Sequence, residues 1–512
     1  MNRLFGTLLF CTLPYVCSAQ LDLDALKRQS DTQALQRKRE SAAFQSGRNE
    51  AWGVFMDARK EEWSKVIASR DVEWTGLLSD SEWTLFDGFL TNTRPDEPKP
   101  VVMPKAEPAI QPAPGPIVLP EQNVVKIPPV EPAVEPPIEE LPCKPAEPLI
   151  SSAGTSFTFY GHPVSVGYDR QMVGFSNAKA SKKDISVFWK NLSETNYTPA
   201  ITALLEVKSG IGLNDWGYYM LVRQFSEKLY SDWNSRILLT WFILVRSGYD
   251  ARVGISNSSV VLLLPSDIDI FDMRYLKIDG ISYYMIAAGQ CESLYTYDEN
   301  YQNGRRFDLY QRQPLSLGGK TASRKLNFSF QGKEYAFDFK YDPDVIDFYK
   351  TLPQAQFEVF FDAVPSTPLQ KSVEDNLKPV IQDMNRSTAI NFLLQFVQLS
   401  FAYKTDPQQF GHEKYFYADE LLAYPYCDCE DRSVLFSYLV STLLGYEVIG
   451  TEFPGHMATA VGLDFETGGT QYKYAGSTYT IADPTYMNAK VGQCMPRYEH
   501  TTPKIHKIDI NR

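Results

Sequence analysis

A proline-rich stretch between residues 92 and 149 divides this chain and limits what its parts can fold into. The stretch holds 17 of the chain's 33 prolines, mixed with Glu, Lys, Val and Ala. Proline has no backbone N–H and fixes φ, so such a segment favours an extended polyproline conformation over a helix or a central strand. We therefore predict a semi-rigid spacer over residues 92–149.

The first residues have the pattern of an export signal. Arg3 supplies a positive charge, residues 4–13 are apolar but too few to span a bilayer, and small residues precede Gln20. We therefore predict a signal peptide over residues 1–19. A lipoprotein signal that uses Cys17 is an alternative, but the bulky Tyr15 and Val16 disfavour it.

Residues 20–91 read as polar and helical. Trp52, Trp63 and Trp74 are spaced eleven residues apart, about three helical turns, so we predict a helical hairpin or a short coiled coil that buries them. No later apolar run reaches about 18 residues, which predicts no transmembrane anchor and a mature protein in the periplasm or outside the cell. The formal net charge of −12 argues against nucleic acid as a partner.

The cysteine count leaves the redox state open. Removal of the signal peptide leaves five cysteines, namely Cys143, Cys291, Cys427, Cys429 and Cys494. An odd number in an oxidising compartment leaves at least one thiol free or paired between chains. If Cys429 is that thiol, the other four could form two disulfides, and the sequence does not say whether they do.

The residues after the spacer contain a weak internal repeat. Residues 234–254 read as an apolar helix that ends at Gly248-Tyr249 and continues into a strand, and residues 433–450 have the same layout. We predict an α+β fold with three parts: a degenerate copy over residues 150–314, a β-rich segment over 315–368, and a complete copy over 369–512. The β-rich segment is predicted from its alternating polar and apolar residues.

The second copy carries the reactive residues. Asp428 is a good N-cap, Glu430 and Asp431 suit the first turn, and Gly445 is a natural end, so we predict a helix with Cys429 at its amino end. A helix amino terminus stabilises a thiolate, whereas Glu430 and Asp431 oppose it, so an imidazolium is needed to lower the pKa of this thiol.

A histidine and an aspartate follow the cysteine helix. His456 begins one apolar strand and Asp483 ends another, and adjacent antiparallel strands can place their side chains together. The carboxylate would accept from one ring nitrogen and fix the tautomer, while the other nitrogen would face the thiol. The order Cys429, His456, Asp483 is therefore typical of a thiol catalytic triad.

The same segments resemble the transglutaminase-like superfamily. The matching features are Cys429-Glu430-Asp431, the helix up to Gly445-Tyr446, the strand at His456 and the run Ile481–Thr485, within about residues 385–490. The resemblance implies a papain-like core in which one helix packs on an antiparallel sheet. It also implies Cys429 as nucleophile, His456 as general base and acid, Asp483 as orienting residue, and Gln398 as a side-chain donor to the oxyanion, with the backbone N–H of Cys429 as its partner.

One position departs from the superfamily pattern. Cys427 stands where glycine is frequent, which leaves open which of the two thiols attacks, although the Glu-Asp pair after Cys429 favours that residue.

These features predict an exported cysteine peptidase or amidase that acts on peptide or cell-wall amide bonds. A peptide or protein, peptidoglycan included, is the expected substrate, and an envelope protein could bind the helical region or the proline-rich arm. Cross-linking as a transglutaminase and a non-catalytic envelope scaffold are the alternatives. No cofactor or metal is expected, and the rival zinc set would be Cys427, Cys429, His456 and Cys494.

Overall fold

The computed structural model describes residues 65–94, 99, 103–106, 117–118, 152–301 and 303–509. The chain divides into two compact units, Met1–Val66 and Ile67–Arg512. The predicted signal peptide, Trp52, Trp63 and Cys143 lie outside the described residues, so the fold below is that of the second unit.

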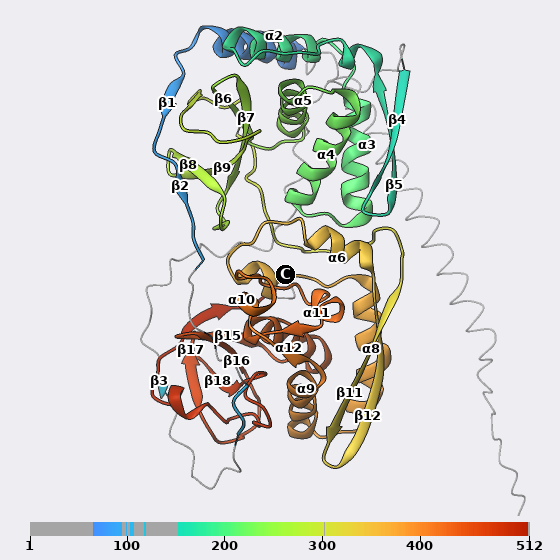
Figure 1. The fold of residues 1–512 in the computed structure, drawn as a ribbon, viewed down its shortest axis with the longest axis vertical. Helices are drawn as coiled ribbons and strands as arrows, with labels where there is room; N and C mark the ends of the chain where they lie inside the picture. Colours follow the sequence, from blue (N-terminus) through green and yellow to red (C-terminus); the bar gives the residue numbers. More distant parts are fainter. Residues whose placement is uncertain are drawn as a thin grey trace, which may run out of the picture. The chain divides into compact units, whose positions relative to one another are not determined.

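The unit combines helices with antiparallel sheets, in agreement with the predicted α+β class. Its first half has a hairpin, several helices and a seven-stranded sheet (Figure 1). In chain order these elements are β1 (Thr84–Phe86), β2 (Leu90–Thr91), β4 (Ser152–Phe159), β5 (His162–Asp169), α2 (Lys182–Ser193), α3 (Thr198–Ile211), α4 (Asp215–Leu229), α5 (Trp233–Arg246), β6 (Arg252–Ser256), β7 (Ser259–Ser266), β8 (Arg274–Ile278), β9 (Ile281–Ile286) and β10 (Leu294–Thr296).

The second half runs from a long hairpin to the end of the described chain. Its elements are β11 (Ala322–Phe330), β12 (Lys333–Tyr341), α6 (Pro343–Tyr349), α7 (Glu358–Phe361), α8 (Thr367–Ile381), α9 (Arg386–Ser400), β13 (Ala402–Tyr403), α10 (Asp406–Gln409), α11 (Glu420–Ala423), β14 (Tyr426–Cys427), α12 (Cys429–Leu444), β15 (Val448–Phe453), β16 (His456–Val461), β17 (Gln471–Tyr474), β18 (Ser477–Ala482) and β19 (Lys504–Lys507).

The two main sheets share one strand order. The first runs β10-β6-β7-β9-β8-β2, with β1 added outside β10, and the second runs β19-β15-β16-β18-β17-β3, where β3 is Ile117–Val118. Neighbouring strands are antiparallel in both sheets except for β3, which pairs in parallel with β17. The helix before each sheet, α5 or α12, packs on the sheet's central strands.

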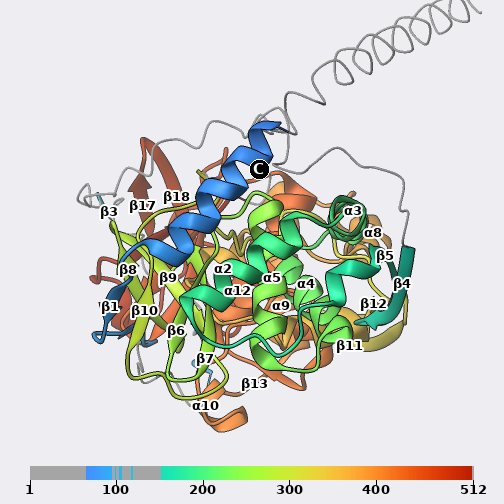
Figure 2. The ribbon, with the colours of Figure 1, turned by 90° about the horizontal axis from the view of Figure 1, so that it is seen from above.

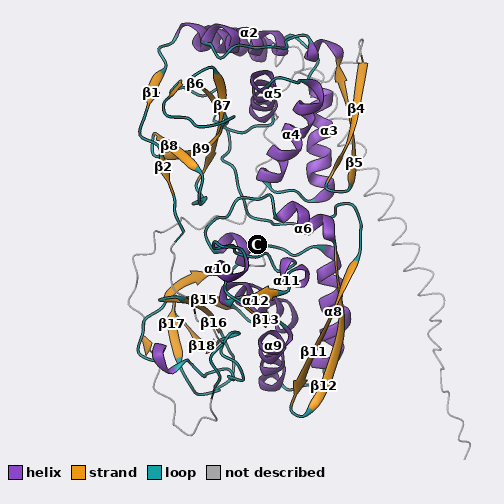
Figure 3. Ribbon diagram, viewed as in Figure 1, coloured by secondary structure: helices purple, strands orange, loops and turns teal. Residues whose placement is uncertain are grey.

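The layout around the helices is also shared. In each half, helices lie between a long hairpin and the main sheet (Figure 3). The hairpin β4–β5 packs on α3 and α4, and β11–β12 packs on α8 and α9. The predicted β-rich segment over 315–368 therefore holds one hairpin, followed by the helices α6 and α7 and the start of α8, and the hairpin packs on helices of the second half.

The end of the predicted N-terminal helical region belongs to the first half. Residues 65–80 are helical, and Trp74 is 2% exposed with its ring against Trp189, Tyr297 and Tyr301. Seen from above, this helix lies beside the first half (Figure 2). Among the described residues, Trp74 thus packs on the chain that follows it, and Thr84–Phe86 and Leu90–Thr91 are strands of the first sheet.

Parts of the predicted spacer are docked on the second half, which corrects the expectation of a simple spacer. Ala106 N donates to Met487 O at 2.8 Å, Met487 N donates to Pro104 O at 3.0 Å, and Ile117–Val118 pairs with β17. Proline cannot donate, but the residues between prolines retain their N–H groups and can pair with an edge strand or loop. Among the described helices, none is both long and apolar enough to cross a membrane.

Candidate active site

The helix α12 begins as its sequence predicts. Asp428 is its N-cap, and Asp431 accepts from the Asp428 N–H at 3.1 Å. Gly445 ends the helix with φ +72°, a conformation that glycine adopts without strain. Cys429 is therefore the first helical residue, where its N–H has no acceptor within the helix.

His456 and Asp483 meet as predicted from their strands. Thr459 of β16 pairs with Ala482 of β18, and continuing this register places Asp483 opposite Ala458, two residues along β16 from His456. His456 Nε2 lies 2.8 Å from Asp483 Oδ2. The other carboxylate oxygen accepts from the backbone N–H groups of Thr485 at 2.9 Å and Tyr486 at 3.1 Å. The carboxylate is thus fixed by the loop and in turn fixes the imidazole.

An aromatic ring stacks on one face of the His456 imidazole, and the second ring nitrogen, Nδ1, makes no hydrogen bond to the described residues. The ring of Tyr498 stacks on His456 with centroids 5.5 Å apart and planes 2° apart. His456 Nδ1 is buried and has no hydrogen-bond partner among the described residues. An unpaired buried ring nitrogen is unfavourable unless it serves a group that approaches it.

Cys429 and His456 line the same small cavity. Its volume is about 40 Å³, room for water molecules but not for a peptide, and Lys99, Glu413 and Glu430 also line it. Ser433 Oγ donates to Cys429 O at 2.8 Å and lies 3.3 Å from Met457 O, so it sits between the start of α12 and β16. The Cys429 thiol and the His456 imidazole therefore lie at the same cavity.

The Cys429 thiol is buried beside a carboxylate. Cys429 is 1% exposed, and its Sγ donates to Glu430 Oε2 at 3.0 Å. Burial and the Glu430 carboxylate raise the pKa of the Cys429 thiol well above its ordinary value, while Lys99 and the Met457 N–H act in the opposite direction. Formation of the thiolate therefore requires a proton acceptor or a change in the surrounding charges.

Cys427 does not reach the cavity. Its Sγ contacts Ala402 O at 3.8 Å and accepts from Arg432 Nε at 3.4 Å. Arg432 is fully buried and also donates to the carbonyl oxygens of Gln398 and Phe401, so the guanidinium joins α12 to the end of α9. Cys429, and not Cys427, therefore lines the cavity that His456 also lines.

The predicted role of Gln398 does not agree with its contacts. Its amide nitrogen donates to Asp483 O, Tyr486 O and Ala489 O at 3.0, 2.9 and 3.1 Å. Its amide oxygen accepts from Asn488 N at 3.1 Å. Both amide hydrogens are committed to the loop after β18, and Gln398 does not line the cavity with Cys429, so it positions Asp483 instead of donating to an oxyanion.

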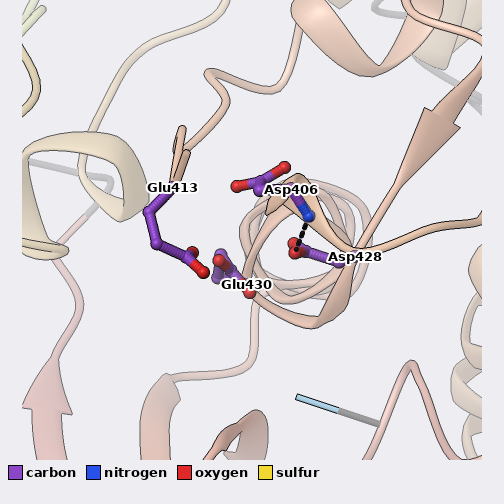
Figure 4. A group of neighbouring side chains, drawn as sticks. All are labelled: Asp406, Glu413, Asp428 and Glu430. Carbon is purple, nitrogen blue, oxygen red and sulfur yellow. Dashed lines mark hydrogen bonds between the residues drawn. The ribbon is translucent and has the colours of Figure 1, made fainter. Parts of the chain in front are cut away.

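A cluster of four buried carboxylates beside the thiol was not predicted. Asp406, Glu413, Asp428 and Glu430 each offer an oxygen within 4.8 Å of the others, and Figure 4 shows Asp428 and Glu430 at the start of a helix with Asp406 and Glu413 facing them. Such an oxygen set could hold a cation such as Ca²⁺. No spacing rule links residues 406, 413, 428 and 430, so the only sequence signal was the pair of acids around Cys429.

The ammonium of Lys99 lies among these carboxylates. Its Nζ donates to Glu413 at 2.7 Å, to Asp428 at 3.0 Å and to Glu430. Burial raises the pKa of Asp406 to about 8, with a further contribution from the charge of Glu430. Burial acts on Glu430 in the same direction, but Lys99 outweighs it and lowers the pKa of Glu430, which remains the ionised partner.

The alternative zinc set does not assemble. Among the described residues, the only group with metal-ligand spacing is the four-carboxylate cluster, and Cys427, Cys429, His456 and Cys494 do not come together. Cys291, Cys427, Cys429 and Cys494 are all free thiols, so none of the described cysteines forms a disulfide.

The reactive residues are confined to the second half. Aligned by the N-caps Asp232 and Asp428, Cys429 corresponds to Trp233. Ser259, the first residue of β7, corresponds to His456, and Ala287, after β9, corresponds to Asp483. No protein-family model, curated protein or solved structure matches this chain.

Proposed function

We propose that this chain is an exported thiol acyl-transfer enzyme, a cysteine peptidase or amidase that acts on amide bonds of peptides or cell-wall peptides. The observation that carries the proposal is the His456–Asp483 pair at 2.8 Å, whose free ring nitrogen belongs to a residue that lines one cavity with Cys429. Thiol, imidazole and carboxylate in this order are the groups that acyl transfer requires.

The proposed reaction has two halves. Cys429 gives its proton to His456 Nδ1 and its sulfur bonds to the substrate carbonyl carbon. The oxyanion accepts from the Cys429 N–H, and the C–N bond breaks as His456 returns the proton to the leaving amine. Water, activated by the same imidazole, then hydrolyses the thioester, which releases the acid and restores the thiol.

The arrangement of the fold supports the proposal that this chain is a member of the transglutaminase-like superfamily. One helix, α12, packs on the antiparallel sheet that carries the histidine and the aspartate. In this proposal the first half is a degenerate copy, since it shares the strand order but has Trp233, Ser259 and Ala287 at the three corresponding positions. Gln398 acts as a positioning residue for Asp483.

The non-catalytic scaffold is a second candidate because the thiol is 1% exposed and its pKa is raised well above its ordinary value by burial. Under that reading the triad residues only hold the helix to the sheet. Full biological activity of a Cys429→Ala variant would favour the scaffold.

The test is the rate of alkylation by iodoacetamide across pH, followed at each cysteine by peptide mass spectrometry. We expect Cys429 to react faster than Cys427, and we expect His456→Ala to remove the difference. Equal rates at the two cysteines, or no effect of His456→Ala, would contradict the proposal. A second experiment separates hydrolysis from cross-linking. A simple amine is added with an acyl substrate, and a transglutaminase would transfer the acyl group to the amine and form an amide, whereas a hydrolase would release the acid.

A further inference from the structure

The ammonium group of Lys99 is enclosed by carboxylates, as the ammonium group of a bound ligand would be. Its side chain is 12% exposed, and its ammonium donates to three carboxylates, those of Glu413, Asp428 and Glu430. Burial opposes the charge, but the Glu430 and Asp428 carboxylates outweigh it, so the pKa of Lys99 is raised well above its ordinary value. A buried ammonium is tolerated only with such partners.

The pocket that receives Lys99 belongs to the second half and not to the proline-rich segment. Asp428 and Glu430 begin α12, Asp406 begins α10, and Glu413 lies in the loop that follows, all at most 4% exposed. Asp428 Oδ1 is buried and has no hydrogen-bond partner among the described residues, even with Lys99 in place. A buried carboxylate that stays ionised, as Glu430 does beside Lys99, needs a cation next to it.

The geometry favours an ammonium group over a guanidinium. Three acceptors surround one nitrogen, which matches the three donors of an ammonium and not the planar fork of a guanidinium.

The pocket adjoins the reactive sulfur. Glu430 contacts the Lys99 ammonium with one oxygen and accepts from Cys429 Sγ at 3.0 Å with the other. Lys99, Glu413 and Glu430 line the cavity that contains Cys429 and His456. A substrate whose side-chain ammonium group bound in this pocket would have its neighbouring atoms close to the sulfur of Cys429.

We propose that Asp406, Glu413, Asp428 and Glu430 form a substrate subsite for a primary ammonium group, as on a lysine-type side chain, and that Lys99 occupies it in cis until substrate displaces it. This inference rests on the proposed function and names its substrate class. Lys99 is then a competitive occupant of the subsite.

The test uses three methanethiosulfonate reagents that differ in charge: aminoethyl (cationic), methyl (neutral) and sulfonatoethyl (anionic). Rates of modification are measured at Cys429 by peptide mass spectrometry in the full mature chain and divided by the rates with a free thiol peptide. The variants are Lys99→Ala, Lys99→Gln and Lys99→Ala with Glu413→Gln. Lys105→Ala is the matched control, because Lys105 is an exposed lysine in the same segment.

In Lys99→Ala and Lys99→Gln we expect the cationic reagent to exceed the neutral one by about tenfold or more, the range that charge-assisted hydrogen bonds provide. Glu413→Gln should reduce this preference, and wild type and Lys105→Ala should show little of it, because Lys99 fills the pocket. Circular dichroism and the unfolding midpoint check that each variant folds.

Equal normalised rates for the three reagents in the Lys99 variants would overturn the inference, as would a preference that Glu413→Gln does not change. Protection by millimolar Ca²⁺ but not by Nα-acetyl-lysine amide would overturn it in favour of a metal site. The rate with the neutral reagent, and its dependence on His456, test the proposed thiol chemistry separately. The ammonium subsite and the proposed function can therefore fail independently.

Discussion

Replacement of Asp483 by Asn should remove most of the activation of Cys429 without unfolding the chain. One oxygen of Asp483 accepts from Thr485 N and Tyr486 N, and the other faces His456 Nε2 at 2.8 Å. An asparagine keeps its oxygen on the two N–H groups, so its NH₂ group must face the imidazole. Nε2 then becomes an acceptor, and Nδ1 carries the hydrogen and cannot take the thiol proton.

The magnitude follows from the loss of the charge-assisted hydrogen bond in which the imidazole donates to the Asp483 carboxylate. A hydrogen bond to a charged group contributes about 1.5–3 kcal/mol, so we expect the alkylation rate of Cys429 near pH 7 to fall roughly 10- to 150-fold. The assay is iodoacetamide labelling read by peptide mass spectrometry. Asp464→Asn is the control, because Asp464 lies in the same half, exposed, and binds Arg386.

A wild-type rate in Asp483→Asn would refute this reasoning, since the thiol would then not depend on the orientation of the imidazole. An equal loss in Asp464→Asn would also refute it, because the effect would be general to carboxylates of this half.

Three further outcomes are expected. Gln398→Leu removes the donor to three buried carbonyls, so it should destabilise the chain by on the order of 3 kcal/mol in denaturant unfolding and slow alkylation of Cys429; a neutral effect on both would contradict its positioning role. His506 lies between two carboxylates that raise its pKa above 6.5 although burial opposes this, so its contribution is complete below pH 6.5 and is lost as pH rises through the folded-state pKa. Unfolding of His506→Gln should lack that pH dependence, and an unchanged profile would exclude the histidine as its source. Cys427→Ala should retain alkylation of Cys429, whereas loss of that alkylation with the fold intact would reassign the nucleophile.

The residues of the proposed triad could be predicted because each lies at the end of an element with a local signal. The N-cap at Asp428 and the glycine at 445 define α12, and His456 and Asp483 flank apolar strands. The antiparallel pairing of β16 with β18 then brings His456 and Asp483 together. This pairing could be expected from the order of the strands in the sequence alone.

Gln398 could not be assigned from its position alone. It lies near the end of α9, and its role depends on the loop that follows β18, whose carbonyl oxygens converge on it from residues 483, 486 and 489. The direction of a loop is not a local property of the helix that faces it, so the sequence could not separate an oxyanion donor from a positioning residue.

Lys99 and the carboxylate cluster were missed for a related reason. A proline-rich composition predicts extended chain but not the few residues that dock, since these pair with loops and edges far along the sequence. Asp406 and Glu413 come from a short helix and a loop with no repeating spacing. Only their shared burial beside Cys429 identifies them as a unit.

The most direct test of the account is formation of an acyl-enzyme at the sulfur of Cys429. The mature chain is mixed with p-nitrophenyl acetate, nitrophenolate release is followed, and the protein is analysed by intact and peptide mass spectrometry. We expect one acetyl group per chain, on Cys429, and loss of the acetylation in His456→Ala and Cys429→Ser. Acetylation spread over other residues, or an unchanged rate in His456→Ala, would contradict it.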